Sequence, residues 1–160
     1  MPQPRFDAPP PSTARTLMAS GSDAPHARWM DRCEELARQA QRAGNTPVGA
    51  VLVLDGVAIA EASEETPAGP RPFAHAEILV VEQALLLRPR PDLRDATLYS
   101  TVEPCILCGY AVREARIGRL VLARAAGEIG SIRSRFPVLT ADWVGRWGPP
   151  PAVVWFGEAT

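Results

Sequence analysis

Apolar and polar residues alternate along most of the chain with the spacing of helices or strands. Between His26 and Ala43, apolar residues recur every three or four positions, which predicts an amphipathic helix. Residues 48–54 and 57–62 are apolar runs that predict two strands. The Asp55-Gly56 pair between these runs is typical of a tight hairpin turn. Residues 26–62 are therefore expected to form a helix followed by a β-hairpin.

The later segments continue this alternation. Residues 74–87 are apolar over most of a helical circumference, so a second, largely buried helix is predicted there. The remaining predicted elements are strands at 96–101, 119–123 and 151–156, a helix at 105–115 and a short helix at 141–146. A hairpin followed by strand–helix–strand crossovers predicts an α/β fold with helices on both faces of the sheet.

Residues 1–25 differ from the rest of the chain. They are rich in proline and serine and contain few large apolar side chains, so their burial cannot offset the entropy of ordering them. We expect a disordered leader at 1–25 and a single domain at 26–160. Met18 is an alternative start of the chain.

Composition and charge favour an ordinary soluble domain. The 160 residues are 46% hydrophobic and 22% charged, and the net charge is −1. This balance argues against strong nucleic-acid binding by the whole chain, although a local basic patch stays possible. The sequence has neither an apolar run of membrane-spanning length nor the apolar core of a signal peptide. The odd number of cysteines, three, argues against a disulfide framework, so we expect a cytoplasmic protein without a membrane.

One histidine and two cysteines form a candidate metal site. Cys105 and Cys108 are three residues apart at the start of a predicted helix, so both sulfurs face the same way. Pro104 precedes them, and the helix N-terminus favours their thiolate form. His75 lies at the start of the preceding helix. Three protein ligands leave the fourth tetrahedral position for water, so this set predicts one catalytic Zn²⁺ per chain.

Two other readings of these residues stay open. The C-x-x-C pair alone could be a redox pair. A structural zinc would need a fourth protein ligand, and His26 and Cys33 are the remaining candidates. Cys33 lies on the apolar stripe of the first helix, so we expect it in the core.

Glu77 is the candidate catalytic residue. It follows His75 by two positions, so it can lean over the open side of the metal. There it can take a proton from zinc-bound water and pass it on. The alternative is an acidic residue that only complements the helix dipole.

The combination His75-Ala76-Glu77 with Pro104-Cys105-Ile106-Leu107-Cys108 resembles the cytidine deaminase-like superfamily of zinc nucleobase deaminases. Residues 97–105 and 116–119 are most similar to the branch that holds tRNA adenosine deaminases, bacterial guanine deaminases and fungal cytosine deaminases. The resemblance implies a three-layer α/β/α sandwich with a five-stranded mixed sheet. It also implies that His75, Cys105 and Cys108 hold zinc while Glu77 shuttles protons.

The implied function is hydrolytic deamination of an exocyclic amine on a small heterocycle, a nucleobase or a nucleoside, by a homodimer. Gly49 and Ala50 are small residues early in a buried strand, where either a ligand or a tightly packed helix could approach the backbone. We expect Gly49, Ala76 and Pro104 to lie beside the substrate. A non-enzymatic zinc module is a rival of another class, but it leaves Glu77 without a role.

Two departures from the family pattern concern the substrate. Members of this branch usually carry an asparagine eleven residues before the zinc histidine, and Glu64 stands at that position. A carboxylate only accepts hydrogen bonds, so Glu64 would suit a substrate that presents N–H or hydroxyl groups, unless a loop shift leaves it in solvent. The C-terminal segment also lacks the basic helix typical of tRNA deaminases. A tRNA adenosine deaminase acting at the wobble position is therefore the alternative, with nucleic acid disfavoured.

Overall fold

The computed structural model describes residues 24–68, 70–87 and 93–157. Most of the predicted leader, residues 1–23, lies outside this part of the chain. The first helix, α1, spans Ala24–Arg42 and thus begins two residues earlier than predicted. Pro25 is compatible with this start, because the N–H groups of a first helical turn have no partner within the helix.

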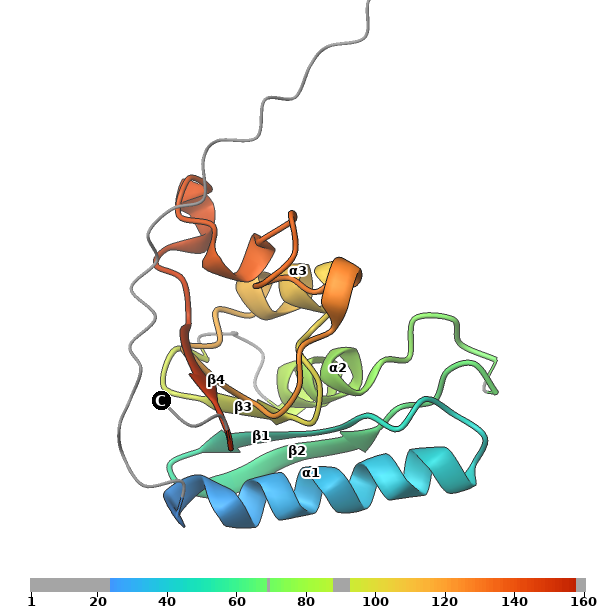
Figure 1. Ribbon diagram of the computed structural model, residues 1–160. Helices are drawn as coiled ribbons and strands as arrows, with labels where there is room; N and C mark the ends of the chain where they lie inside the picture. The colour runs from blue at the N-terminus through green and yellow to red at the C-terminus, as the bar shows by residue number, and fades with distance from the viewer. Residues whose placement is uncertain (1–23, 69, 88–92, 158–160) are drawn as a thin grey trace, which may run out of the picture.

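One mixed sheet of five strands organises the described residues, with the strand order β2-β1-β3-β4-β5. The strands are β1 (Gly49–Leu54), β2 (Val57–Ser63), β3 (Thr97–Ser100), β4 (Arg119–Leu122) and β5 (Ala152–Trp155). β1 runs antiparallel to both β2 and β3, whereas the β3–β4 and β4–β5 pairs are parallel. The sequence prediction of a hairpin followed by parallel crossovers is therefore confirmed (Figure 1).

The predicted hairpin turn also has the expected backbone. Asp55 and Gly56 both adopt positive φ, 52° and 74°, which is the left-handed pair that a two-residue turn with the twist of the strands requires.

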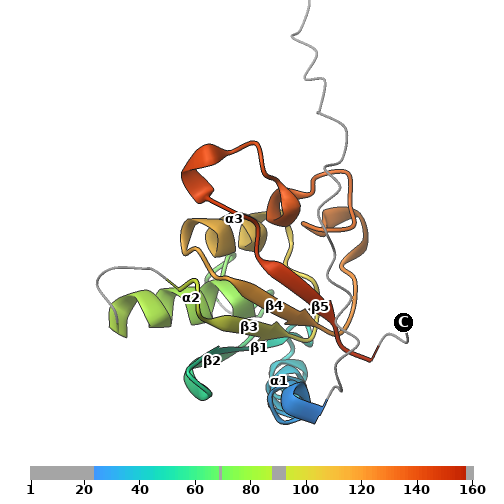
Figure 2. The same ribbon diagram turned by 90° about the vertical axis from the view of Figure 1, so that its left-hand side faces the viewer.

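Helices cover both faces of the sheet, as Figure 2 shows: α1 lies on one side, and α2 (Ala76–Leu87) and α3 (Ile106–Glu114) lie on the other. β1 is buried along its whole length because its side chains alternate between the two layers. Val51 and Val53 pack in the α1 layer with Cys33, whereas Leu52 packs with Val80 of α2. The three-layer α/β/α prediction is confirmed.

The close approach predicted at Gly49 is made by a helix. A Cβ atom added to Gly49 would lie 2.1 Å from the Cys33 carbonyl oxygen and 2.8 Å from the Ala37 nitrogen. Only glycine lets α1 lie this close to β1. A contact between Gly49 and a substrate stays a prediction.

Two local predictions are wrong. The second helix is buried only as far as Ala84, and Leu85, Leu86 and Leu87 are 37%, 86% and 67% exposed. The last turn of α2 extends past the strands, so an apolar circumference there does not lead to burial (Figure 2). Instead of a helix at 141–146, short 3₁₀ turns occupy Val138–Thr140 and Gly145–Trp147. None of the helices in the described ranges combines the length and hydropathy that a membrane span needs.

Candidate metal centre

Two helix starts bring the predicted metal ligands together. His75 immediately precedes α2, Cys105 is the N-cap residue of α3, and Cys108 lies in the first turn of α3. β3 ends at Ser100 and leads directly to Cys105, so the site lies beyond the carboxyl end of a parallel strand. Sites in open α/β sheets collect at this edge.

The distances between the three ligand atoms match a tetrahedral zinc site. The sulfurs of Cys105 and Cys108 are 3.5 Å apart, and they lie 3.7 and 3.6 Å from Nδ1 of His75. Zinc bound at about 2.3 Å from sulfur and about 2.0–2.1 Å from nitrogen requires edges of about 3.8 Å (S···S) and about 3.6 Å (S···N). The residues therefore fit zinc, with Nδ1 as the ligand nitrogen of His75.

The other two readings of these residues gain no support from the described part of the chain. The group of metal-ligand side chains found there consists of His75, Cys105 and Cys108. His26 lies apart from it, with its Nδ1 3.0 Å from the Tyr99 hydroxyl oxygen. Cys33 is fully buried in the α1 layer, as predicted. A three-ligand set leaves one tetrahedral position for water.

The two thiols have opposite pKa shifts. The hydrogen bond between the sulfurs of Cys105 and Cys108, together with backbone N–H groups at the start of α3 and with His75, lowers the pKa of Cys105 to about 5. The same interaction and burial raise the pKa of Cys108. Cys105 is thus the first of the two to become a thiolate, the form that binds metals.

Glu77 is buried beside the ligands and accepts a hydrogen bond from Ser100. It is 4% exposed, and the Ser100 hydroxyl at the end of β3 donates to its Oε1 over 2.8 Å. Burial raises the pKa of Glu77 to about 7, and the negative charge of Glu64 acts in the same direction, while the Ser100 hydrogen bond opposes them. The Glu77 carboxylate also interacts with the neighbouring Cys108 thiol, so it lies next to the metal ligands, and its catalytic role stays a prediction.

Glu64 points inward, not into solvent. It is 4% exposed, its Oε2 accepts the backbone N–H of Ala76 over 2.9 Å, and its Oε1 accepts the Thr66 hydroxyl. Glu64 therefore caps the N-terminus of α2, where an N–H group has no partner within the helix. The Ala76 N–H group is therefore already engaged in a hydrogen bond. Substrate contacts by Glu64 and Ala76 stay predictions.

A loop holds Pro104 in place. The backbone N–H and the hydroxyl of Ser131 both donate to the Pro104 carbonyl oxygen, over 3.0 and 2.6 Å. Cys105 forms an isolated antiparallel bridge with Gly130. The segment around 130 thus lies directly against the metal ligand. A contact of Pro104 with substrate stays a prediction.

Two residues of the site were missed from the sequence. Ser100 orients Glu77, and Glu103 anchors the loop after β4. The Glu103 carboxylate is 1% exposed and accepts the backbone N–H groups of Ala126, Ile132 and Arg133 over 3.0, 2.6 and 3.0 Å. The sequence did contain one indication of these roles. Both residues are polar and lie at or just after the end of a buried strand, immediately before the ligands, and buried polar groups are usually hydrogen-bonded.

The chain matches the family model described as "Cytidine and deoxycytidylate deaminase zinc-binding region" over residues 23–124. Among curated proteins, it is 39% identical over 93 residues to the tRNA-specific adenosine deaminase of Bacillus subtilis, a match that covers 58% of each chain. It is 35% identical over 105 residues to the enzyme of the same description from Aquifex aeolicus, which covers 64% of this chain and 70% of that one. The match with the Bacillus subtilis relative thus spans less than two thirds of its length.

Solved structures agree with the sequence matches. A structure from work on A-to-I editing by tRNA:A34 deaminases at the wobble position of transfer RNA superposes with a TM-score of 0.73 and 32% identity. The superposition covers 81% of this chain and 98% of that chain. A guanine deaminase from Bacillus subtilis superposes with a TM-score of 0.59 and 34% identity, over 62% and 64% of the two chains.

Proposed function

We propose that this chain, which belongs to the cytidine and deoxycytidylate deaminase zinc-binding family, is a zinc-dependent hydrolytic deaminase. The reaction replaces an exocyclic amine on a nucleobase or nucleoside by a carbonyl group, consumes one water and releases ammonia. The observation that carries the proposal is the convergence of His75, Cys105 and Cys108 with the buried carboxylate of Glu77 beside them.

The residues divide the chemistry between them. His75, Cys105 and Cys108 would hold the zinc, which supplies a nucleophilic water of lowered pKa when bound. Glu77 takes a proton from the nucleophile and delivers protons to the ring nitrogen and to the leaving amine. Ser100 keeps the Glu77 carboxylate oriented through their hydrogen bond.

Ammonia release tests the proposal directly. Zinc-loaded protein is incubated with a panel of purines, pyrimidines, pterins, triazines and their nucleosides, and ammonia is measured by a coupled assay. We expect turnover of at least one amino-substituted compound and none of the matched compounds that carry a carbonyl group instead. Zinc-replete protein that releases ammonia from no compound, including tRNA, contradicts the proposal.

The second candidate is deamination of adenosine at the wobble position of a tRNA. It is favoured by the relatives from Bacillus subtilis and Aquifex aeolicus and by the structure with a TM-score of 0.73. A cavity of about 800 Å³ also begins at Ile106, next to the ligand Cys105, and its walls include Ile129, Arg135 and Phe136. Apolar and aromatic surfaces beside basic groups suit bases and phosphates of a single-stranded segment.

Inosine formation separates the two candidates. A tRNA transcript with adenosine at the wobble position is incubated with the protein, digested to nucleosides and analysed for inosine. Inosine at that position, with salt-sensitive tRNA binding, supports the second candidate. Activity on free bases or nucleosides alone excludes it.

The proposed enzyme is a homodimer, and it works in a reducing compartment. Large apolar side chains on the helices of one face are exposed, among them Leu86 at 86%, Leu107 at 43% and Tyr110 at 48%. Such side chains favour burial against another protein surface. Sedimentation equilibrium of the zinc-loaded protein tests the dimer, and a monomer at micromolar concentration contradicts it.

A further inference from the structure

A second, smaller cavity lies at the end of the sheet opposite the metal centre. Its volume is about 210 Å³, and Arg94, Gly118 and Pro150 in its wall precede β3, β4 and β5. The metal ligands follow the other end of β3. The two sites are therefore separated by the length of the parallel strands, and a ligand of this cavity is not the substrate at the zinc.

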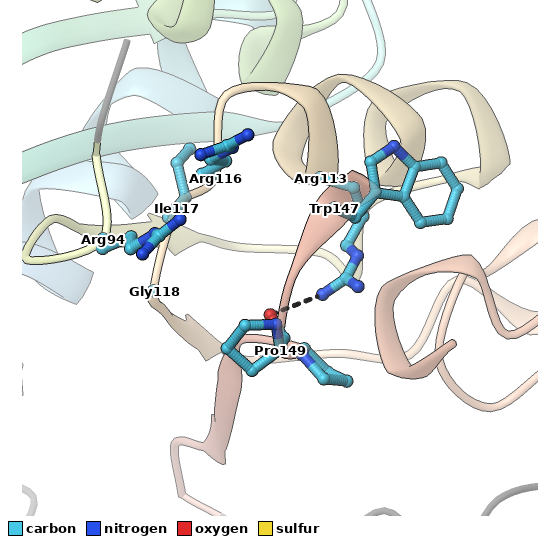
Figure 3. A pocket seen from close by; sticks show the side chains of 8 residues that line it. Arg94, Arg113, Arg116, Ile117, Gly118, Trp147 and Pro149 are labelled. Carbon is cyan, nitrogen blue, oxygen red and sulfur yellow. Dashed lines mark hydrogen bonds between the residues drawn. The ribbon is translucent and has the colours of Figure 1, made fainter. Parts of the chain in front are cut away.

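Three arginines line this cavity. Figure 3 shows Arg94 and Arg116 on one side, Arg113 and Trp147 on the other, and Pro149 between them. Arg94 comes from the segment before β3, and Arg113 and Arg116 come from the end of α3 and the turn after it. Arg94 and Arg116 are exposed. The cavity thus has one buried cationic wall and one accessible cationic wall.

Arg113 is a buried cation that contacts no carboxylate in the described ranges. It is 2% exposed, and its terminal nitrogens donate to the backbone carbonyls of Pro149, Ala141 and Gly148 over 2.9–3.0 Å. Its Nε has no hydrogen-bond partner there. The carbonyls carry only partial charges, so a full positive charge remains at the cavity wall, and buried charges are normally paired.

The acidic residue of α3 next to Arg113, Glu114, already has other partners. Glu114 forms an ion pair with Arg146 and accepts the Trp147 indole N–H over 2.7 Å. The Trp147 ring lies under the Arg113 guanidinium, and the distance from Cζ of Arg113 to the ring centroid is 5.3 Å. This arrangement fixes the wall next to Arg113 and keeps the Glu114 charge engaged elsewhere.

We propose that this cavity, lined by Arg94, Arg113 and Arg116, binds the phosphate group of a small molecule, either inorganic phosphate or a phosphomonoester. Guanidinium groups match phosphate oxygens in geometry and charge. The volume is below the range of about 300–1,000 Å³ that is usual for whole small-molecule ligands, so it suits one phosphate group and not a complete nucleotide. The ligand would supply the missing counter-charge of Arg113.

Binding to the zinc-loaded full chain tests the proposal. Inorganic phosphate and ribose 5-phosphate are titrated by calorimetry, with sodium chloride of equal ionic strength as the reference. The double variant Arg94→Gln/Arg116→Gln removes the two accessible cations and leaves Arg113 and its carbonyl contacts intact. We expect its Kd for phosphate to rise by about tenfold or more, because each charge-assisted hydrogen bond contributes substantially to binding.

The matched control removes two exposed arginines elsewhere. Arg38→Gln/Arg42→Gln changes the net charge equally on α1 and is expected to leave the Kd unchanged. Zinc content, measured in parallel, should stay the same in all three proteins. Ribose 5-phosphate binding more tightly than inorganic phosphate supports a phosphomonoester, and the reverse order supports the free ion. Equal affinities in the two double variants, no binding beyond that of chloride, or binding only of a polynucleotide would each overturn the proposal.

Discussion

The Glu64 carboxylate accepts the backbone N–H of Ala76 over 2.9 Å and so caps the helix that follows the ligand His75 and carries Glu77. Glu64→Ala leaves this buried N–H without a partner. We expect the variant to lose about 1–3 kcal/mol in the free energy of unfolding, measured by urea denaturation of zinc-loaded protein. The neighbouring exposed residue gives a control, because Glu65→Ala should change stability by less than about 0.5 kcal/mol.

Glu64 also allows a test of specificity. An amide at this position both donates and accepts hydrogen bonds, whereas the carboxylate only accepts. Glu64 contacts Ala76, and it could contact the substrate in addition. In that case Glu64→Asn will change the relative kcat/KM values across a panel of amino-substituted bases. Identical relative values for the variant and the natural protein would show that Glu64 is only a helix cap.

Glu77→Gln should remove turnover without removing the metal. The amide keeps the shape of the side chain but cannot accept the proton, so we expect kcat to fall by about a hundredfold or more. Zinc content measured by atomic absorption should stay near that of the unaltered protein. Glu82→Gln, at an exposed residue of the same helix, should keep full activity. Loss of zinc in Glu77→Gln would show that Glu77 acts on the metal site and not on the proton.

Cys108→Ala should abolish stable zinc binding, whereas Cys33→Ala should not. The first variant removes one of three ligands, and the second removes a core thiol outside the ligand group. Zinc per chain after dialysis is expected to fall from about one to near zero only in Cys108→Ala. Retained zinc in that variant would mean that another side chain completes the site.

Glu103→Gln should loosen the loop against Cys105. The carboxylate accepts three backbone N–H groups, and the amide places an NH₂ group among these donors. A loss of about 1–3 kcal/mol in the free energy of unfolding is expected, with faster hydrogen exchange at Ala126, Ile132 and Arg133. Glu128→Gln, on the same loop but exposed, is the control. Unchanged exchange at the three amides would contradict an anchoring role for Glu103.

Cys33 should resist alkylation until the protein unfolds. Burial raises the pKa of its thiol above the ordinary value of 9.0, so the folded state keeps a proton that the unfolded state releases at alkaline pH. This contribution to stability is complete below about pH 9 and is lost as the pH rises further. Peptide mapping after iodoacetamide treatment at pH 8 should find Cys33 unmodified in native protein and modified in urea. Modification of the native protein would contradict the buried position.

The features that were predicted correctly depend on local spacing. Cys105 and Cys108 face one way because residues three apart share a helix face, and the Asp55-Gly56 turn follows from the backbone preferences of two residues. Buried strands and the stripe that holds Cys33 could likewise be recognised from periodicity.

The features that were missed depend on contacts between distant segments. Glu103 accepts hydrogen bonds from backbone N–H groups more than twenty residues later in the chain, in a loop whose sequence has no periodicity. Whether Glu64 turned inward depended on the exact path of a loop, and only the structure shows that it reaches the start of α2. The exposure of Leu86 depends on where the sheet ends. The apolar pattern of a helix carries no information about the extent of the sheet that it packs against.

The position of the ligands also affects the order in which this protein can mature during synthesis. His75, Cys105 and Cys108, together with the paired strands β1 and β3, all lie between Gly49 and Glu114. A growing chain therefore exposes the complete ligand set before the partners of Glu103 at 126–133 or the edge strand β5 emerge from the ribosome. This order allows metal capture to come first and closure of the surrounding loop to come second.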